Sequence, residues 1–332
     1  MAVALAVGLW CADAEEPSRD VPALRQILDL SEREIGALTN GEVITRVEAT
    51  EGTEVMGAAA VRVQTTADRL ITGFRRVTGF TQSQLVRTAA VISPMPSARD
   101  FAALTLAPSE VRELRDCRVG NCAMKLSAGD IARFRKEVKW DSGATHGQVE
   151  ALLRDVLAGE ATRYLRGGDA MLTPLADKEE PLNRAAEFEA IFSRSQTLES
   201  VVPGFSRRLS NPPATNGEGD ADFVYWSSID IGLKPVISIT HVQVQRPGPA
   251  GVDVVIASKQ IYANHYFDAS LSVTALVRPA PTSPGYLLYV NRSRVDLFKG
   301  WFGGFTRSIV RRRVRDGLQK NMRLAREHLE KP

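Results

Sequence analysis

The sequence predicts an α+β fold in which an antiparallel sheet of long strands packs against a long C-terminal helix and carries a helical insertion. Between residues 222 and 291, five segments rich in Val, Ile, Tyr and Thr follow one another without a helical pattern between them, so antiparallel pairing is expected. From Phe305 to Leu329, apolar residues recur every three or four positions and form one stripe over about seven turns. A helix with one apolar stripe must lie along an apolar surface, and the sheet provides one.

The remaining elements follow from changes of periodicity along the chain. A short helix is expected within residues 15–40, and Thr65 or Thr66 is the expected N-cap of a helix that follows the second strand. The predicted strands are 42–49, 55–64, 85–92, 222–231, 236–245, 252–261, 270–277 and 286–291. The predicted helices of the central region are 109–116, 128–139, 146–165 and 182–195. A loop rich in Pro, Gly and Asn at 210–220 ends that region.

The N-terminus is typical of a secretory leader. An apolar run over residues 1–11 precedes Ala-Asp-Ala at residues 12–14, which fits the small-x-small pattern of a cleavage site. No Lys or Arg precedes the run, so an upstream start or a simple apolar helix are the alternatives. We predict a signal peptide over 1–14 and an exported protein, periplasmic or secreted. No later segment reaches the ~20 apolar residues of a membrane-spanning helix.

Cysteine usage supports this compartment. Without the leader, the remaining cysteines are Cys117 and Cys122, and two thiols in an exported chain favour one disulfide. The intervening residues 119–121, Val-Gly-Asn, supply the turn that brings the two cysteines together. A zinc site would need two more suitable ligands, and the four histidines are scattered. No metal or cofactor is therefore predicted.

The net charge and the distribution of basic residues indicate which macromolecular partners the sequence favours. The formal charge of +3 is the remainder of 42 basic and 39 acidic residues, which is too small to indicate a nucleic-acid-binding protein. Basic residues do cluster in the C-terminal helix, just after an aromatic, Gly-rich segment. Trp301, Phe302 and Phe305 are expected either to seal the core or to make peripheral membrane contact, with Arg311–Arg313 attracting anionic head groups. The length of the apolar stripe favours burial.

The order of elements resembles that of the START-like (helix-grip, SRPBCC) superfamily. A strand that runs into a short helix, a long meander and a closing helix occur in residues 58–77, 222–291 and 298–329. In that fold, a curved antiparallel sheet wraps the C-terminal helix and leaves a cavity between them. The resemblance implies a lipid or other apolar ligand in this cavity, or alternatively a cyclase- or hydrolase-like activity. It divides the mature chain into 15–108 and 211–332, which form one domain, and a mainly helical insertion, 109–210.

One segment, residues 258–270, concentrates polar and aromatic side chains where two strands join. Ligand cavities combine apolar walls with a few convergent polar groups. The residues predicted to bind ligand, here and on neighbouring strands, are Tyr225, Trp226, His241, Lys259, Tyr262, His265 and Tyr266. The alternative is that Asn264 and Asp268 form a turn and the aromatic side chains pack across strands.

Catalysis has weaker support than binding. The sequence lacks a nucleophile elbow, a phosphate loop, paired metal-binding histidines and a dinucleotide fingerprint. His241 and His265 lie in the β-rich region, where a lone histidine is more often structural than catalytic. No catalytic residue is predicted.

Overall fold

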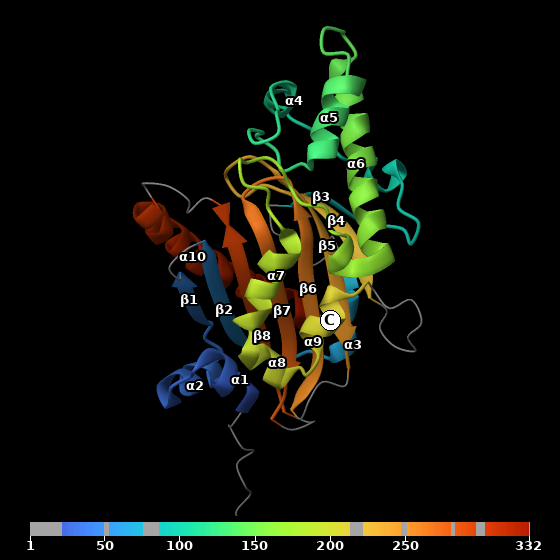
Figure 1. Cartoon of the computed structure of the whole chain (residues 1–332). Helices are drawn as coiled ribbons and strands as arrows, with labels where there is room; N and C mark the ends of the chain where they lie inside the picture. The colour runs from blue at the N-terminus through green and yellow to red at the C-terminus, as the bar shows by residue number, and fades with distance from the viewer. Residues whose placement is uncertain are drawn as a thin grey trace, which may run out of the picture.

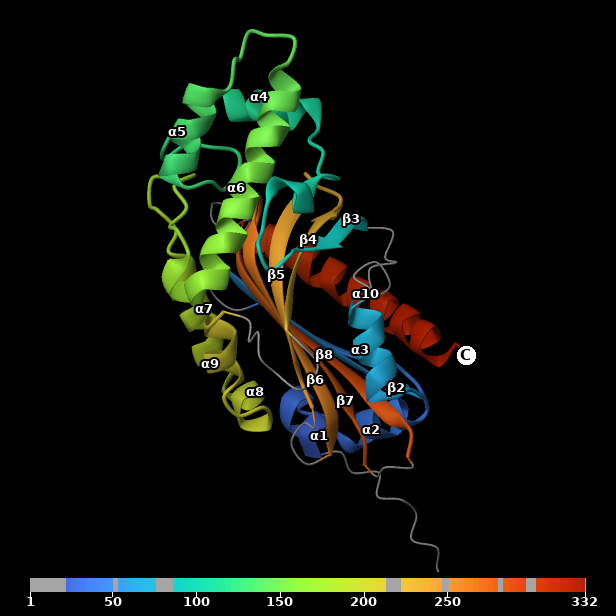
Figure 2. The same cartoon turned by 90° about the vertical axis from the view of Figure 1, so that its right-hand side faces the viewer.

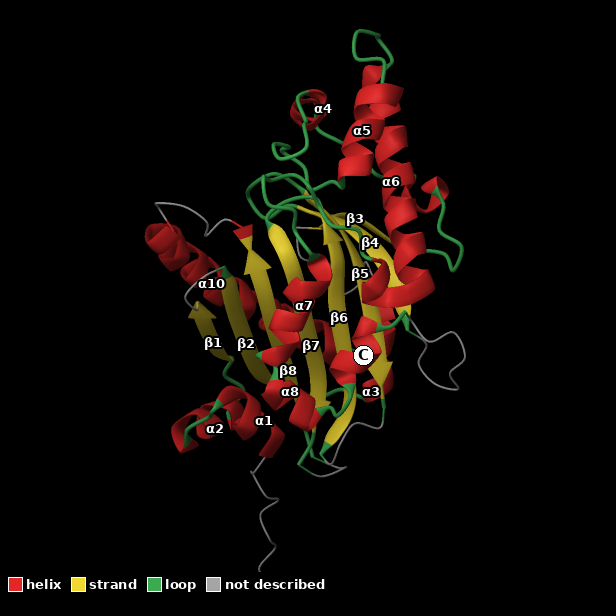
Figure 3. Ribbon diagram, in the orientation of Figure 1, coloured by secondary structure: helices red, strands yellow, loops and turns green. Residues whose placement is uncertain are grey.

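The chain folds around one antiparallel sheet. The structure, a computed structural model, describes residues 22–49, 53–75, 86–212, 222–246, 251–279, 283–296 and 303–331. In these residues eight strands are ordered β1-β2-β8-β7-β6-β5-β4-β3, as Figures 1 and 3 show. The strands are β1 (Ile44–Ala49), β2 (Glu54–Val63), β3 (Val86–Val91), β4 (Phe223–Ile229), β5 (Val236–Gln245), β6 (Val252–Ala263), β7 (Phe267–Val277) and β8 (Gly285–Val295). The predicted α+β class with a C-terminal helix packed on an antiparallel sheet is confirmed.

Side chains of each strand alternate between two faces of the sheet, and each face has its own helices. On the face that we call the α10 face, Val61, Val254 and Leu287 pack against α3 (Ala67–Arg75) and α10 (Gly303–Glu330). On the opposite face, which we call the α7 face, Val255 and Leu288 pack against α1 (Pro22–Leu28), α7 (Arg184–Ser193), α8 (Gln196–Val201) and α9 (Phe205–Ser210). Figure 2 shows the sheet between these two layers.

Most helices lie between β3 and β4, which pair with each other in the sheet. The first part contains η1 (Ala98–Phe101), α4 (Pro108–Arg115), α5 (Ala128–Glu137), α6 (Thr145–Gly167) and η2 (Gly168–Met171). Helices α4 and α5 and one end of α6 project beyond one end of the sheet (Figure 1). Their core, which includes Phe134 and Leu153, continues into Trp226 and Tyr262 of the sheet.

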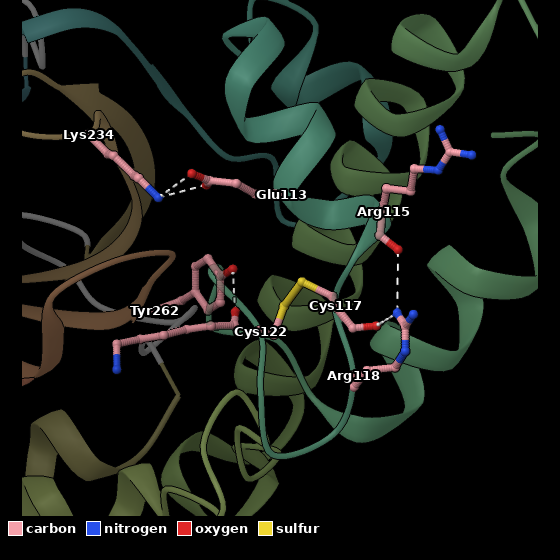
Figure 4. The surroundings of a disulfide bond; sticks show 8 residues. Glu113, Arg115, Cys117, Arg118, Cys122, Lys234 and Tyr262 are labelled. Carbon is pink, nitrogen blue, oxygen red and sulfur yellow. Dashed lines mark hydrogen bonds and ion pairs between the residues drawn. A yellow bond between two sulfur atoms is a disulfide. The ribbon is translucent and has the colours of Figure 1, made fainter. Parts of the chain in front are cut away.

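The predicted disulfide Cys117–Cys122 is present and lies in this helical region, with Glu113, Lys234 and Tyr262 among its surroundings (Figure 4). Between the cysteines, Arg118 and Asn121 exchange two backbone hydrogen bonds of 2.9 and 3.0 Å. Gly120 has a φ of +85°, which a residue without Cβ adopts readily. The turn predicted from residues 119–121 therefore closes the pair.

Several elements differ from their predicted bounds for local reasons. The helix expected within 15–40 is two helices, α1 and α2 (Glu32–Thr39), because Asp29 adopts a φ of +49° between them. Ser31 starts α2: its backbone N–H donates to Glu34 Oε2 at 3.0 Å. Strand β8 runs on to Val295 because its alternating polar residues pair with β2 and β7. The N-cap of α3 is Thr66, whose Oγ1 accepts from the Arg69 N–H at 3.2 Å.

Some sequence predictions fall largely outside the described residues. These are the signal peptide over 1–14, most of the loop 210–220, and the aromatic segment with Trp301 and Phe302; the side chain of Phe305 is also not described. Within the described residues, no helix combines the length and apolar character needed to cross a membrane.

Candidate functional site

A cavity of about 490 Å³ lies between the α10 face of the sheet and α10. This volume falls within the range of roughly 300–1,000 Å³ that is usual for small-molecule sites. Its sheet side is formed by Gly57, Thr274, Leu287, Tyr289 and Asn291, and Phe74 of α3 also lines it. Its helix side is formed by Val314, Gly317, Leu318, Asn321, Met322, Leu324, Ala325, Glu327 and His328, and Lys331 follows the helix.

The position of α10 on the sheet defines one side of this cavity. Gly57 lets the helix approach β2 closely, since a Cβ at that position would lie 3.1 Å from Leu318 Cδ1 and 3.2 Å from Val314 Cγ1. Near the other end of the helix, Arg326 Nη1 donates to Gly41 O at 2.7 Å and Glu330 Oε1 accepts from the Gln64 N–H at 2.9 Å. Helix α10 is thereby held over β1 and β2, at one side of the sheet. Parts of β7 and β8 line the cavity beside it.

The sheet side of the cavity carries no charged side chain, and its polar side chains form hydrogen bonds within the sheet. Asn291 Nδ2 donates to Ser270 Oγ at 3.1 Å and to Leu271 O at 3.2 Å. Burial raises the pKa of Tyr289 to about 12, against the opposing effect of a hydrogen bond with Ser272. The Tyr289 hydroxyl therefore stays protonated at physiological pH and is able to donate a hydrogen bond.

None of the seven residues predicted to bind ligand lines this cavity. Tyr225 lies on the α10 face, half-buried beside Phe223. Trp226 lies on the other face, where its Nε1 donates to Asp100 O at 2.6 Å and its ring packs on Phe101. The assignment of these two residues to ligand binding stays a prediction.

His241 and Lys259 are brought together on the α7 face, as cross-strand neighbours in β5 and β6. Lys259 Nζ binds Asp169 of η2 and donates to Leu209 O at 3.0 Å. The hydroxyl of Tyr164 lies 2.8 Å from His241 Nδ1. Both predicted residues are fully buried, and burial lowers the pKa of His241 and brings that of Lys259 to about 8.

This buried cluster is enclosed by aromatic rings. Lys259 Nζ lies 4.3 Å from the ring centroid of Phe188 and 5.6 Å from that of Phe192, both on α7. In this structure its polar contacts join η2, α6 and the end of α9 to the sheet. The assignment of Lys259 and His241 to ligand binding stays a prediction.

Tyr262 and the neighbouring turn are tied to Lys125, a buried residue of the loop that follows the disulfide. The hydroxyl of Tyr262 donates to Lys125 O at 2.9 Å, and Asn264 O accepts from the Lys125 N–H at 2.9 Å. Lys125 Nζ lies 2.7 Å from Asp268 and 3.0 Å from Asp296, and Asp177 is 3.9 Å away. This ion cluster attaches the helical insertion to the ends of β7 and β8.

His265 and Tyr266 form the turn between β6 and β7. Tyr266 has a φ of +62°, and its hydroxyl accepts from the Lys234 N–H at 3.0 Å. His265 Nε2 lies 3.6 Å from Glu110 Oε1, and neither atom has a hydrogen-bond partner in the described structure. The rings of His265 and Tyr266 lie 5.6 Å apart, centroid to centroid, whereas Lys259 lies in the buried cluster with Asp169. Their assignment to ligand binding stays a prediction.

The cavity-lining residues of the sheet were missed, although a signal for them exists. Thr274, which lines the cavity, continues the alternating series Ser270 and Ser272 along β7, and the lining residues Tyr289 and Asn291 alternate along β8. A polar series at every second position places these side chains on one face of each strand. Recognising them as cavity-lining required knowing that this face meets α10.

Among the described residues, no group of three or more His, Cys, Asp or Glu side chains is arranged to hold a metal ion. In comparisons with known proteins, neither a model of a protein family nor a curated protein matches this sequence.

Proposed function

We propose that this protein is an exported START-like binding protein that holds a lipid or other apolar ligand between its sheet and α10. The observation that carries the proposal is the cavity of about 490 Å³ at the place that the START-like resemblance implies. Its walls include Phe74, Leu287, Leu318 and Met322, and burial of ligand hydrocarbon against such side chains contributes roughly 25 cal/mol per Å².

Export is supported by two independent features. The apolar run and Ala-Asp-Ala of residues 1–14 fit a cleaved leader, and the Cys117–Cys122 disulfide suits an oxidising compartment. Intact-mass analysis of material from an exporting host tests both. A chain that starts near Glu15 and is 2 Da lighter than its reduced form supports the proposal, whereas a full-length chain with three alkylatable thiols contradicts it.

Ligand binding is tested by filling the cavity from α10. Gly317 lines the cavity, and a Cβ at this position would meet nothing within 4 Å, so Gly317→Trp adds an indole without an enforced backbone clash. Gly147 of α6 has equally open surroundings and lies outside the cavity lining, so Gly147→Trp is the matched control.

The probe is Nile red, an uncharged apolar dye whose fluorescence rises in apolar surroundings. We expect saturable binding by the wild type and by Gly147→Trp, and at least tenfold weaker binding by Gly317→Trp. Equal binding by both variants places the dye elsewhere and contradicts the proposal. Absence of saturable binding by the wild type contradicts it as well.

We further propose that α10 contacts anionic membranes during ligand exchange. Exposed basic side chains of the described helix support this proposal: Arg311, Arg312, Arg313, Arg315, Lys320 and Arg323. Such a face attracts anionic lipid, by about 1 kcal/mol for each basic residue near the surface. Co-sedimentation with anionic vesicles that weakens with added salt, and is absent with zwitterionic vesicles, is the expected result; equal binding to both vesicle types contradicts it.

A further inference from the structure

The charges that line the cavity lie at its rim. The charged side chains among the described lining residues are those of Glu327 and Lys331, with the titratable His328 beside them. All three are exposed, and they lie at the C-terminal end of α10 and just beyond it. The sheet side, by contrast, presents hydroxyl, phenol and amide groups together with apolar side chains.

These neutral groups are ordered across the sheet. In one cross-strand row of the α10 face, Ser258, Ser272, Asn291 and Gly57 are successive partners on β6, β7, β8 and β2. In the next row, Thr274 pairs with Tyr289, and in the row beyond it, Leu276 pairs with Leu287. The face thus changes from hydrogen-bonding to apolar over these rows, and the cavity includes residues of all three.

An anionic ligand group finds no net positive charge among the lining residues at either end of this gradient. At the polar end it would meet uncharged side chains, and burying an unpaired charge is strongly unfavourable. At the exposed end, the lining carries both a cation, Lys331, and an anion, Glu327, and the C-terminal end of a helix carries partial negative charge.

We infer that the ligand is an uncharged, largely hydrocarbon molecule whose hydroxyl or carbonyl group bonds to Tyr289 and the neighbouring polar row. Its hydrocarbon part then lies against Leu287, Phe74 and Met322. The inference rests on the proposed function and adds the chemical class of the ligand. Because Tyr289 keeps its proton, it is able to donate to an uncharged oxygen of the ligand.

The test compares decan-1-ol with decanoate at pH 8, where the acid is ionised, as competitors of bound Nile red. We expect the alcohol to compete at least tenfold more strongly than the acid. Tyr289→Phe should weaken competition by the alcohol about 3- to 10-fold, the usual range for one neutral hydrogen bond. The matched control is Tyr286→Phe, which removes the same hydroxyl from the α7 face of the same strand and should leave competition unchanged.

Equal or stronger competition by decanoate overturns the inference, and so does unchanged competition in Tyr289→Phe. If Tyr289→Phe does not fold, Thr274→Val removes another hydroxyl from the sheet side of the cavity. Weaker competition by the alcohol is then expected for Thr274→Val, and unchanged competition overturns the inference. Nile red that binds but is not displaced by the alcohol overturns the ligand class while the proposed function stands. Failure of Nile red to bind at all contradicts the proposed function itself.

Discussion

Replacing Lys125 by Met should strongly destabilise the protein, because this buried cation holds three carboxylates. The side chain is 3% exposed, and its Nζ lies 2.7 Å from Asp268, 3.0 Å from Asp296 and 3.9 Å from Asp177. Removing one partner of a buried ion pair typically costs about 3–5 kcal/mol, since the remaining charge is left uncompensated. We expect a loss in this range for Lys125→Met.

Lys178 provides the matched control. Its Nζ lies 2.8 Å from Asp296, but its side chain is 46% exposed, and exposed pairs contribute about 0–1 kcal/mol. Urea unfolding of the oxidised protein, followed by circular dichroism, compares the free energies of unfolding of the wild type, Lys125→Met and Lys178→Met. A loss below about 1 kcal/mol in Lys125→Met, equal to that of Lys178→Met, would show that the buried cluster contributes no more than an exposed ion pair.

The pH dependence adds a second test of the same cluster. Burial lowers the pKa of Lys125, but the charges of Asp268, Asp177 and Asp296 outweigh it and raise the pKa above its usual value of 10.5. A raised lysine pKa contributes stability that is present below 10.5 and is lost as the pH rises through the folded value. The difference in free energy of unfolding between the wild type and Lys125→Met should therefore stay constant up to about pH 10 and become smaller at higher pH.

Three further predictions concern other parts of the chain. Gly317→Ala should raise the free energy of unfolding by about 1 kcal/mol, because Ala is the better helix former and its Cβ meets nothing within 4 Å; unchanged stability in urea would contradict this. Replacing both Cys117 and Cys122 by Ser should lower it by about 2 kcal/mol, since the loop between them is short; no change in a thermal melt would contradict this. Burial lowers the pKa of Lys259 to about 8, so the folded state binds fewer protons than the unfolded state above that pH. The stability of the wild type relative to Lys259→Met should therefore rise between pH 8 and 10, and a fall would contradict it.

The sheet and its closing helix were predictable because their signals are local. Strand β5 has the predicted bounds, Val236–Gln245, since the segment is rich in Val and Ile. The apolar stripe of α10 includes Leu318, Met322 and Leu329, which are buried against the sheet. The disulfide also followed from residue type and the turn at Gly120.

The candidate site was harder to predict because it depends on which face of the sheet meets which helix. Lys259 and His241 are conspicuous polar residues of strands, but their side chains lie on the α7 face, where Asp169 and Tyr164 contact them. Tyr164 is 77 residues from His241 in sequence, and Asp169 is 90 residues from Lys259. Both partners lie in the helical insertion, and no local sequence pattern predicts contacts over such separations. Gly57, which sets the position of α10, has no distinctive sequence context.

Photo-crosslinking most directly tests the claim that an uncharged apolar ligand lies between the sheet and α10. A decanol analogue that carries a diazirine on its chain is bound to the wild-type protein and irradiated, and labelled peptides are identified by mass spectrometry. We expect labelling of β7, β8 and α10 around Thr274, Leu287 and Met322, with competition by unlabelled decan-1-ol. Labelling concentrated on residues 258–268, or labelling that excess decan-1-ol does not reduce, would contradict it.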